Sequence, residues 1–306
     1  MRIAVLDIGG TCIKSGVFEN GKLYSVCETS SKAMLGGKSL IQQAIGILRL
    51  QYCDCQGIGI STAGQVDSEN GSIIYANQNI PDYTGTQVKK ILEEEFGMPV
   101  FVENDVNAAA IGEARYGTGL DERHKDFICV TYGTGIGGAL ILNGNLFRGS
   151  SFSAGEVGRI ITHGCDCPQG GIKDYPLDCY YEYHASTTAL VRRAQHINPK
   201  LKDGRTILRN MESPDIQKIV DEWIEEVVLG MVSLVHIFNP KMIVAGGGIM
   251  CEERIVRKID LLLKERIMPS FRKVTVKAAK LGNRAGMIGI GYVAATQLQG
   301  VQEEEA

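Results

Sequence analysis

The chain has 306 residues, of which 44% are hydrophobic and 22% charged, enough to bury the cores of two domains. Its 32 basic and 35 acidic residues give a formal charge of −3, so no strong positive field attracts nucleic acid or an anionic membrane, and a small molecule is the expected partner. No apolar run approaches the roughly 18 residues that span a bilayer, and the N-terminus lacks a signal-peptide layout, so we expect a cytoplasmic protein.

The first half of the chain alternates between strand and helix patterns. Apolar runs bounded by turn residues predict strands at 3–9, 13–26, 57–62 and 99–105. Asn20-Gly21 divides the second of these runs, and this dipeptide favours a two-residue hairpin turn. Apolar residues at helical spacing predict helices at 39–50 and 86–96.

The second half begins a similar cycle near residue 126. The segment DFICVTYG predicts a strand, and GGALILNGNLFRG predicts a hairpin that turns at Asn143-Gly144. Further strands are predicted at 242–248 and 273–280. Helices are predicted at 186–197, 213–237, 252–268 and 286–299.

The two halves open with similar units, LDIGGTCIKSGV in the first and VTYGTGIGGALI in the second. Each unit contains a strand, a glycine turn with a threonine, and the start of a hairpin. Such a repeat predicts a duplicated α/β domain with a ligand cleft between the copies. We expect an N-terminal lobe of residues 1–118 and a larger C-terminal lobe of residues 119–306, with helix 286–299 packing back on the first lobe.

Three glycine turns follow predicted strands. Asp7-Ile8-Gly9-Gly10-Thr11 places unobstructed backbone amides beside a carboxylate, a combination that can hold phosphate oxygens and orient a metal-bound water. Gly133–Gly138 is a second glycine turn that could hold phosphate oxygens in the same way. It is not a Walker loop, because the Walker lysine is missing, and it is not a dinucleotide fingerprint, because a strand and not a helix is predicted after it. Ala245–Gly248 would let a flat ring approach the backbone. Each turn taken by itself also fits an ordinary chain reversal.

The stretch FVENDVNAAA at 101–110 joins a strand pattern to an alanine-rich helix pattern. Asn104 and Asp105 stand at the junction. Either side chain suits the N-cap of the helix, because both accept hydrogen bonds from otherwise unpaired backbone amides. The alternative is a chemical role for the carboxylate, and the local sequence leaves both interpretations open.

Six short motifs in this order resemble the ROK family of sugar kinases and repressors, within the hexokinase and actin-like ATPase superfamily. They are DIGGT, GISTAGQVD, ENDVNAAA, GTGIGGALI, SAGEVG and NPKMIVAGGG, which together extend over nearly the whole chain. The resemblance implies a two-lobed α/β fold of the duplicated ribonuclease H-like type, with the active site in the interlobe cleft. It also implies a kinase that uses ATP and Mg²⁺ to phosphorylate a sugar hydroxyl, usually on C6.

The resemblance assigns roles to the residues at matching positions. Asp105 would be the general base that accepts the proton of the attacking hydroxyl, while Asn104 fixes the sugar. The sugar-binding residues that the family implies are Ala63, Gly64, Asn104, Asp105, Glu156, Arg159 and Glu182. The nucleotide-binding residues that it implies are Asp7, Gly9, Gly10, Thr11, Lys14, Gly133, Thr134, Gly135, Gly246, Gly247 and Gly248.

The sequence departs from the family pattern in the cysteine-containing loop 159–182. Members with a zinc motif read Gly-Glu-x-Gly-His, whereas Arg159 occupies the histidine position here and cannot ligate zinc. Cys165, Cys167 and Cys179 are candidates for a structural Zn²⁺ site with His163 as a candidate fourth ligand, and the alternative is a loop of reduced cysteines. Arg159 also alters the sugar pocket, and β-glucoside kinases are among the members without the intact metal motif.

Three functions remain open. The first is the ATP-dependent sugar kinase, for which the phosphate-binding and base residues are all present. A ROK repressor would carry a DNA-binding module of roughly 70 to 80 residues before the first glycine turn, whereas Asp7 is nearly terminal, so nucleic acid is not an expected partner. The third is a catalytically silent sugar-binding regulatory protein. Family resemblance makes a homodimer the expected assembly.

Overall fold

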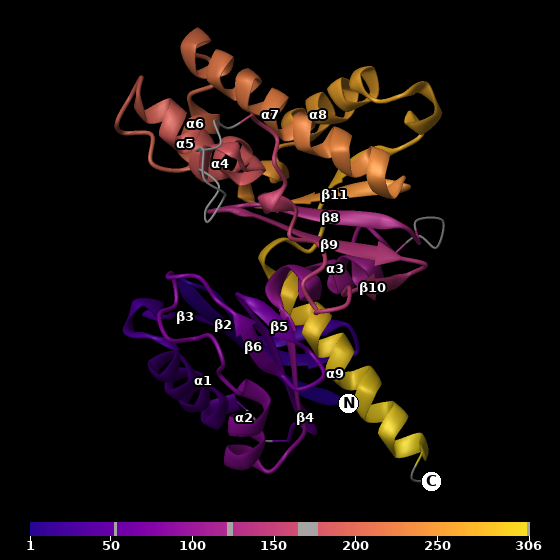
Figure 1. Cartoon of the computed structure of the whole chain (residues 1–306). Coiled ribbons are helices and arrows are strands. Elements are labelled where there is room, and N and C mark those ends of the chain that lie inside the picture. The colour runs from indigo at the N-terminus through magenta and orange to yellow at the C-terminus, as the bar shows by residue number, and fades with distance from the viewer. Residues whose placement is uncertain (52–53, 121–124, 165–176, 305–306) are drawn as a thin grey trace, which may run out of the picture. The chain divides into compact units, whose positions relative to one another are not determined.

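The structure is a computed structural model that describes residues 1–51, 54–120, 125–164 and 177–304 (Figure 1). The chain divides into two compact α/β units. Unit 1 consists of Met1–Leu120, Asn145–Ala154 and Asn283–Ala306, and unit 2 of Asp121–Gly144 and Gly155–Gly282. The segment Asn145–Ala154, which the sequence prediction had placed with the C-terminal lobe, therefore groups with unit 1.

The sheet of unit 1 has the strand order β3-β2-β1-β4-β7. Its strands are β1 (Arg2–Ile8), β2 (Cys12–Glu19), β3 (Lys22–Ser30), β4 (Gly57–Thr62) and β7 (Val100–Asn104). The first three form an antiparallel meander, whereas β4 pairs parallel to β1 and β7 pairs parallel to β4. Asn20 (φ 49°) and Gly21 (φ 79°) form the predicted hairpin turn, in which both residues take positive φ.

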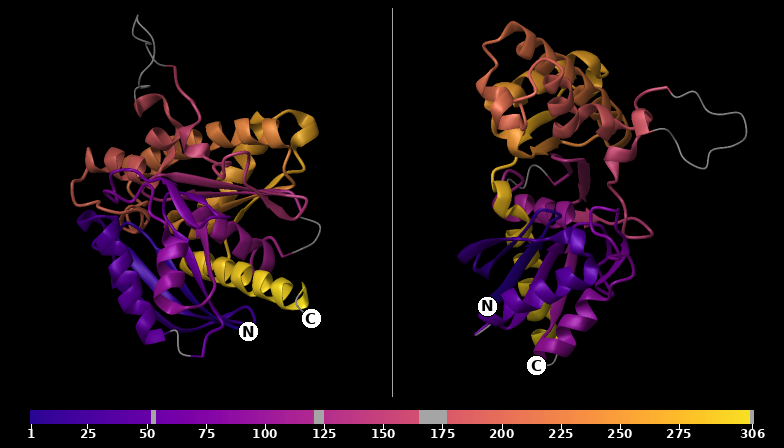
Figure 2. Two further views of the ribbon diagram at one scale, coloured as in Figure 1. Left: turned by 60° about the horizontal axis from the view of Figure 1, so that its bottom comes forward. Right: turned by 90° about the vertical axis from the view of Figure 1, so that its left-hand side faces the viewer.

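Helices cover both faces of this sheet. The helices of unit 1 are α1 (Gly37–Gln51), α2 (Val88–Phe96), α3 (Asp105–Tyr116) and α9 (Ala285–Glu304). Apolar side chains of α1 and α2 join those of β1, β4 and β7 in one buried cluster that includes Ile58 and Ile60. On the opposite side, a Cβ at Gly59 would lie 3.1 Å from Ile290 of α9. Helix α9 also packs along α3 (Figure 2). A short hairpin of β5 (Gln65–Asp67) and β6 (Ser72–Tyr75) was not predicted.

The second five-stranded sheet has the order β10-β9-β8-β11-β12. Unit 2 contributes β8 (Phe127–Tyr132), β9 (Ile136–Leu142), β11 (Met242–Gly246) and β12 (Thr275–Ala278), whereas β10 (Asn145–Phe147) lies in the segment that groups with unit 1. β8 and β9 are antiparallel, and β11 pairs in parallel with both β8 and β12. Asn143 (φ 53°) and Gly144 (φ 77°) form the second predicted turn. The two sheets share one topology, as the repeated sequence units predicted.

The helices of unit 2 are α4 (Tyr181–Ala185), α5 (Thr187–Gln195), α6 (Gly204–Arg209), α7 (Pro214–Phe238) and α8 (Glu253–Arg266). The long helix α7 packs against α4, α5 and α8 in unit 2. Short 3₁₀ turns lie at Ala33–Leu35, Val157–Arg159, Leu177–Cys179, Gly248–Cys251, Pro269–Phe271 and Gly282–Arg284. Throughout the described ranges, no helix has both the length and the apolar character needed to cross a bilayer.

Two buried aromatic side chains fix α4 against α7. Trp223 Nε1 on α7 donates to Ala185 O (2.9 Å) and Ser186 O (3.1 Å), at the junction of α4 and α5. Tyr181 OH on α4 donates to Val227 O (2.6 Å). A side chain at Gly230 would overlap the Tyr181 ring, so this glycine permits the close approach. The position of α4 matters because this short helix carries the candidate site residue Glu182.

Candidate active site

The carboxyl ends of three parallel strands meet at one edge of the unit 1 sheet. β1, β4 and β7 are neighbours in the ladder, and Asp7 lies opposite Ser61. At the end of β7, Asn104 Nδ2 donates to Gly64 O (2.9 Å). At the end of β4, Ala63 N donates to the last residue of β1 (3.0 Å). The structure thus brings together, within one unit, residues that come from three separate sequence motifs.

Asn104, and not Asp105, caps the N-terminus of α3. Its Oδ1 accepts hydrogen bonds from Val106 N (2.9 Å) and Asn107 N (3.0 Å). Asp105 is the first residue of the helix, and its Oδ1 accepts from Val106 N (2.9 Å) and from Asn104 Nδ2 (3.0 Å). Among the described residues, these hydrogen bonds of the Asp105 carboxylate involve Oδ1 alone, which leaves Oδ2 for chemistry.

The environment of Asp105 favours its protonated form. Burial raises the pKa of this carboxyl from 3.8 to about 7, and the negative charge of Asp7 adds to the increase. Hydrogen bonds from the backbone and from Asn104 lower the pKa and offset part of this effect. A carboxylate with a pKa near neutrality is suited to accept a proton in one step and release it in the next.

Asp7 is held by two partners on neighbouring strands. Lys14 Nζ lies 3.1 Å from Oδ2, and Ser61 Oγ donates to Oδ1 (2.9 Å). Partial burial disfavours the ammonium group, but the Asp7 carboxylate outweighs this effect, so the pKa of Lys14 is raised overall. A side chain at Gly286, in the first turn of α9, would lie 2.9 Å from Ser61 Oγ and 3.2 Å from Asp7 Oδ1. This glycine therefore keeps space beside the carboxylate.

The first glycine turn presents open backbone. Gly9 N donates to Cys12 O (2.9 Å), which closes the turn between β1 and β2. No atom lies within 4 Å of the position that a Cβ at Gly10 would occupy, and Thr11 is exposed. Gly64 differs, because its φ of 102° and the proximity of Tyr75 O require glycine for structural reasons.

A buried ion pair supports the start of α3. Glu103 is 1% exposed, and its Oε2 lies 2.7 Å from Arg148 Nη2 and 3.1 Å from Nε. The other oxygen, Oε1, accepts from Asn104 N (2.9 Å) and Asn107 Nδ2 (3.1 Å). Glu103 thus holds the backbone of the residue that caps α3. Neither Glu103 nor Arg148 was predicted as part of the site, because they are 45 positions apart in the sequence and no local pattern marks the pair.

Two glycine turns meet at the corresponding edge of the unit 2 sheet. Gly246, at the end of β11, pairs with Thr131 of β8, and Gly247 (φ 104°) approaches Tyr132 so closely that a Cβ there would lie 2.2 Å from the Tyr132 carbonyl oxygen. No atom lies within 4 Å of the Cβ positions at Gly133 and Gly248. These two glycines leave backbone exposed for a ligand, whereas Gly247 serves the packing of the two strands.

The turn at 133–135 is tied to the start of α5. Thr187 N donates to Gly133 O (3.0 Å), and Thr187 Oγ1 donates to Tyr132 O (2.9 Å). Gly133 N in turn donates to Gly135 O (3.0 Å). Thr134 at the tip is exposed. The turn is therefore held from both sides while its tip remains accessible.

Glu182 on α4 lies against the same turn. Its Oε2 is 3.5 Å from Ile136 N, and its Oε1 is 3.5 Å from Arg159 Nε. A Cβ at Gly135 would lie 2.7 Å from Glu182 Oε2, which explains the glycine at this position. The Arg159 guanidinium lies over the Tyr180 ring, 5.0 Å from its centroid. Arg159 and Glu182, both predicted from the resemblance, are thus neighbours.

Glu156 is exposed and follows Gly155, whose lack of a side chain allows close backbone packing. A Cβ at Gly155 (φ 97°) would lie 2.5 Å from Gly138 O, and a Cβ at Gly138 would lie 2.6 Å from Gly155 O. The two backbones therefore pack directly on each other. This contact fixes Glu156 and the start of the 3₁₀ turn that follows it and includes Arg159.

The predicted cysteine cluster is described only in part. Cys165 and Cys167 lie outside the described residues. Cys179 is a fully buried thiol without a disulfide bond. Its carbonyl oxygen accepts from Thr162 N (3.1 Å), a contact that is independent of the thiol. Among the described residues, the group of side chains that could hold a metal ion does not include Cys179.

Comparison with known proteins gives one consistent result. The model of the ROK family matches residues 3–297. An uncharacterized protein of Clostridium perfringens is 40% identical over 299 residues, which cover 94% of this chain and 96% of that protein. A β-glucoside kinase of Listeria innocua is 31% identical over 302 residues, which cover 95% of this chain and 97% of that protein. A crystal structure of a ROK family glucokinase from Streptomyces griseus, in complex with glucose and AMPPNP, matches with a TM-score of 0.80 at 28% identity and covers 96% of this chain and 99% of that one.

Proposed function

The chain belongs to the ROK family and has the α/β fold of its actin-like kinases, and from this premise we propose that it is an ATP-dependent sugar kinase. In the proposed reaction, the γ-phosphoryl group of ATP passes to a hydroxyl, the one on C6, of a hexose or hexose derivative. The observation that carries the proposal is the arrangement at the start of α3, where Asn104 caps the helix and Asp105 has a pKa of about 7.

Asp105 is the general base in this proposal. Phosphoryl transfer depends mainly on positioning and charge neutralisation, and it needs a carboxylate within hydrogen-bond reach of the attacking hydroxyl. Asp105 accepts the proton of the sugar hydroxyl as the oxygen attacks phosphorus, and it releases that proton to solvent after the product leaves. Asn104, whose amide is oriented by Gly64 O, positions the sugar beside it.

The glycine turns and Asp7 are assigned to the nucleotide. Gly10, Gly133 and Gly248 have no atoms within 4 Å of their Cβ positions, which lets phosphate oxygens approach the backbone of these turns. Asp7 offers the oxygen donors that Mg²⁺ prefers, and bound Mg²⁺ would neutralise phosphate charge. Lys14 and Ser61 keep the Asp7 carboxylate in a fixed orientation. The other residues assigned to the nucleotide are Gly9, Thr11, Thr134, Gly135, Gly246 and Gly247.

Glu156, Arg159 and Glu182 are assigned to the sugar. Carboxylates accept hydrogen bonds from pairs of hydroxyls, and the Arg159–Tyr180 pair adds a cationic edge and an aromatic face. An arginine does not reproduce the contacts of the family's histidine, so the acceptor need not be free glucose. Because the Listeria innocua relative is a β-glucoside kinase, we propose a β-linked glucoside as the acceptor class.

The test is ADP release measured over a panel of sugars with ATP and Mg²⁺. The panel contains glucose, N-acetylmannosamine, other hexoses and β-linked glucose disaccharides. The proposal predicts ADP release that depends on sugar, with the β-linked disaccharides giving the highest kcat/KM. Sugar binding without any ADP release would support the alternative, a catalytically silent regulatory protein.

The same proposal includes properties that the family resemblance implies beyond the site. These are a cytoplasmic location, a homodimeric assembly, Mg²⁺ dependence, and lobes divided near residue 118. Analytical ultracentrifugation would test the dimer directly, with a single species of twice the 33.2 kDa chain mass as the expected result.

A further inference from the structure

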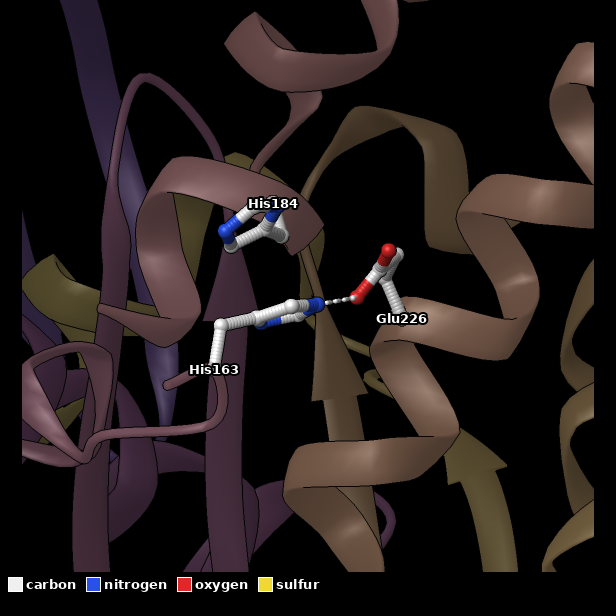
Figure 3. A group of neighbouring side chains, drawn as sticks. All are labelled: His163, His184 and Glu226. Atoms are coloured by element: carbon white, nitrogen blue, oxygen red, sulfur yellow. Dashed lines mark ion pairs between the residues drawn. The ribbon is translucent and has the colours of Figure 1, made fainter. Parts of the chain in front are cut away.

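Three potential metal ligands from separate parts of unit 2 lie close together. His163 follows the 3₁₀ turn at Val157–Arg159, His184 lies on α4, and Glu226 lies on α7 (Figure 3). One ligand atom from each residue lies within 4.8 Å of the other two. All three side chains are half-buried, so the group is neither a solvated surface cluster nor sealed from water.

Each of the three side chains has a second contact that orients it. His184 Nε2 lies 2.5 Å from Asp178 O, and a carbonyl can only accept, so Nε2 carries the proton and Nδ1 carries the lone pair. His163 Nδ1 lies 3.1 Å from Thr162 Oγ1. When the hydroxyl accepts from Nδ1, the lone pair of His163 is on Nε2. Ligating histidines in proteins are oriented in this way, through a hydrogen bond from the other ring nitrogen.

The carboxylate is oriented by the same principle. Arg193 Nη2 lies 3.3 Å from Glu226 Oε1, and His163 Nε2 lies 3.3 Å from Glu226 Oε2. Oε2 therefore points into the group while Oε1 is held from outside. The dashed line in Figure 3 marks the His163–Glu226 contact. A metal ion at this point would lie between these two ligand atoms.

From these contacts we propose that His163, His184 and Glu226 bind one divalent transition-metal ion, with Zn²⁺ as the representative. Two imidazole nitrogens and one carboxylate oxygen suit such ions, whereas Mg²⁺ and Ca²⁺ prefer oxygen donors throughout. Ligands at about 2.0–2.1 Å in a tetrahedron are about 3.3 Å apart, which the Nε2–Oε2 distance already satisfies. Water would take the fourth position.

Binding requires one rearrangement. The rings of His163 and His184 are stacked, with centroids 3.7 Å apart and an interplanar angle of 25°. The in-plane lone pairs of stacked rings lie in two separate, nearly parallel planes, so one ion cannot lie in the plane of both rings. His184 must tilt out of the stack while it keeps its hydrogen bond to Asp178. This motion closes the remaining separation within the group.

The proposed ion would join three segments that no disulfide connects among the described residues. It would fix the chain after Arg159 and the short helix α4 to the long helix α7. The site is independent of the kinase reaction, because none of its three ligands is among the residues assigned to ATP or sugar. It shares His163 with the predicted cysteine site, where His163 was the candidate fourth ligand, but Cys179 is not part of this group.

The experiment is a metal titration of the full-length chain, produced without an affinity tag and stripped of metal with a chelator. Co²⁺ is added first, because its visible absorption reports tetrahedral coordination, and Zn²⁺ is then added in competition. We expect one Co²⁺ per chain, displaced by Zn²⁺, and no equivalent signal with Mg²⁺. Bound Zn²⁺ should also raise the melting temperature.

Variants separate the proposed site from other metal-binding groups. His184→Ala and Glu226→Gln should each lower the Co²⁺ affinity by at least about 10-fold, while the exposed His196→Ala control leaves it unchanged. The double variant Cys165→Ser/Cys167→Ser should retain wild-type binding. The proposal is wrong if the wild-type chain binds no Co²⁺, if binding survives intact in folded His184→Ala and Glu226→Gln, or if the cysteine double variant abolishes it.

Discussion

Asn104 and Asp105 divide two tasks at the start of α3. Asn104 satisfies the unpaired backbone amides of the helix, so Asp105 is not required as a cap. The low-dielectric surroundings and the nearby Asp7 charge then raise the pKa of Asp105 to about 7. A capping carboxylate would instead be stabilised in its charged form and would be a weaker base.

The raised pKa of Asp105 has a consequence for stability. The carboxyl has a pKa of 3.8 when unperturbed and about 7 in the folded chain, so between these values the folded state binds more protons than the unfolded state. Stability contributed by this group therefore falls as pH rises from about 4 to about 7. We expect Asp105→Asn to melt at a higher temperature than the wild type at pH 8, with a smaller difference at pH 5. Equal differences at both pH values in thermal melts would contradict the raised pKa.

A second prediction concerns the buried ion pair between Glu103 and Arg148. Arg148→Met leaves the buried Glu103 carboxylate without its counter-ion and should destabilise the chain by about 2 kcal/mol or more. Arg49→Met is a matched control, because Arg49 pairs with Glu95 at the surface and should cost less than about 1 kcal/mol. Urea unfolding curves measure both. Similar values for the two variants would mean that the Glu103 pair has no special role.

Glycines determine how α9 packs against α3. A Cβ at Gly289 would lie 1.7 Å from Ala108 O, and a Cβ at Gly112 would lie 2.5 Å from Ala285 O. Gly289→Ala should therefore destabilise unit 1 by about 3 kcal/mol. Gly300, in the same helix, has no atom near its Cβ position, so Gly300→Ala should stabilise the chain by about 0.5–1 kcal/mol. Thermal melts with shifts in the same direction for both variants would refute this account of the helix contact.

Some glycines in these turns are needed for backbone packing, and others leave space for a ligand. Gly10→Ala adds a methyl group into open space and should leave the melting temperature within a few degrees of the wild type, while raising the KM for ATP because the methyl group lies where phosphate would approach. Gly138→Ala is the contrasting variant, because its methyl group would meet the Gly155 carbonyl and should lower the melting temperature. An unchanged KM for ATP in Gly10→Ala would remove this turn from the nucleotide site.

Over the whole molecule, long helices and strands could be predicted from the spacing of their apolar residues, whereas the shortest elements could not. The predicted helix at 213–237 is observed as Pro214–Phe238, and both Asn-Gly turns are confirmed. By contrast, α4, α6 and the β5–β6 hairpin have strands or helices of three to six residues, too short to display a period.

The candidate site was predictable where a local motif marks it. Glycine turns and the Asn104-Asp105 junction are recognisable from adjacent residues, and the sequence left open which of the two residues caps the helix. Long-range pairs have no such signal. Arg148 is 45 residues from Glu103, and Glu226 is distant in sequence from His163, so only the folded chain reveals these contacts.

The central claim is that Asp105 removes a proton from a sugar hydroxyl, and its most direct test is turnover as a function of pH. With saturating ATP and sugar, wild-type kcat should rise about tenfold from pH 6 to pH 8, because the base is active when deprotonated and its pKa is about 7. Asp105→Asn should lower kcat by about 10²-fold or more and abolish this rise, while its sugar dissociation constant stays within a few-fold of the wild type. Near-normal turnover in that variant, with the wild-type pH profile, would contradict the account.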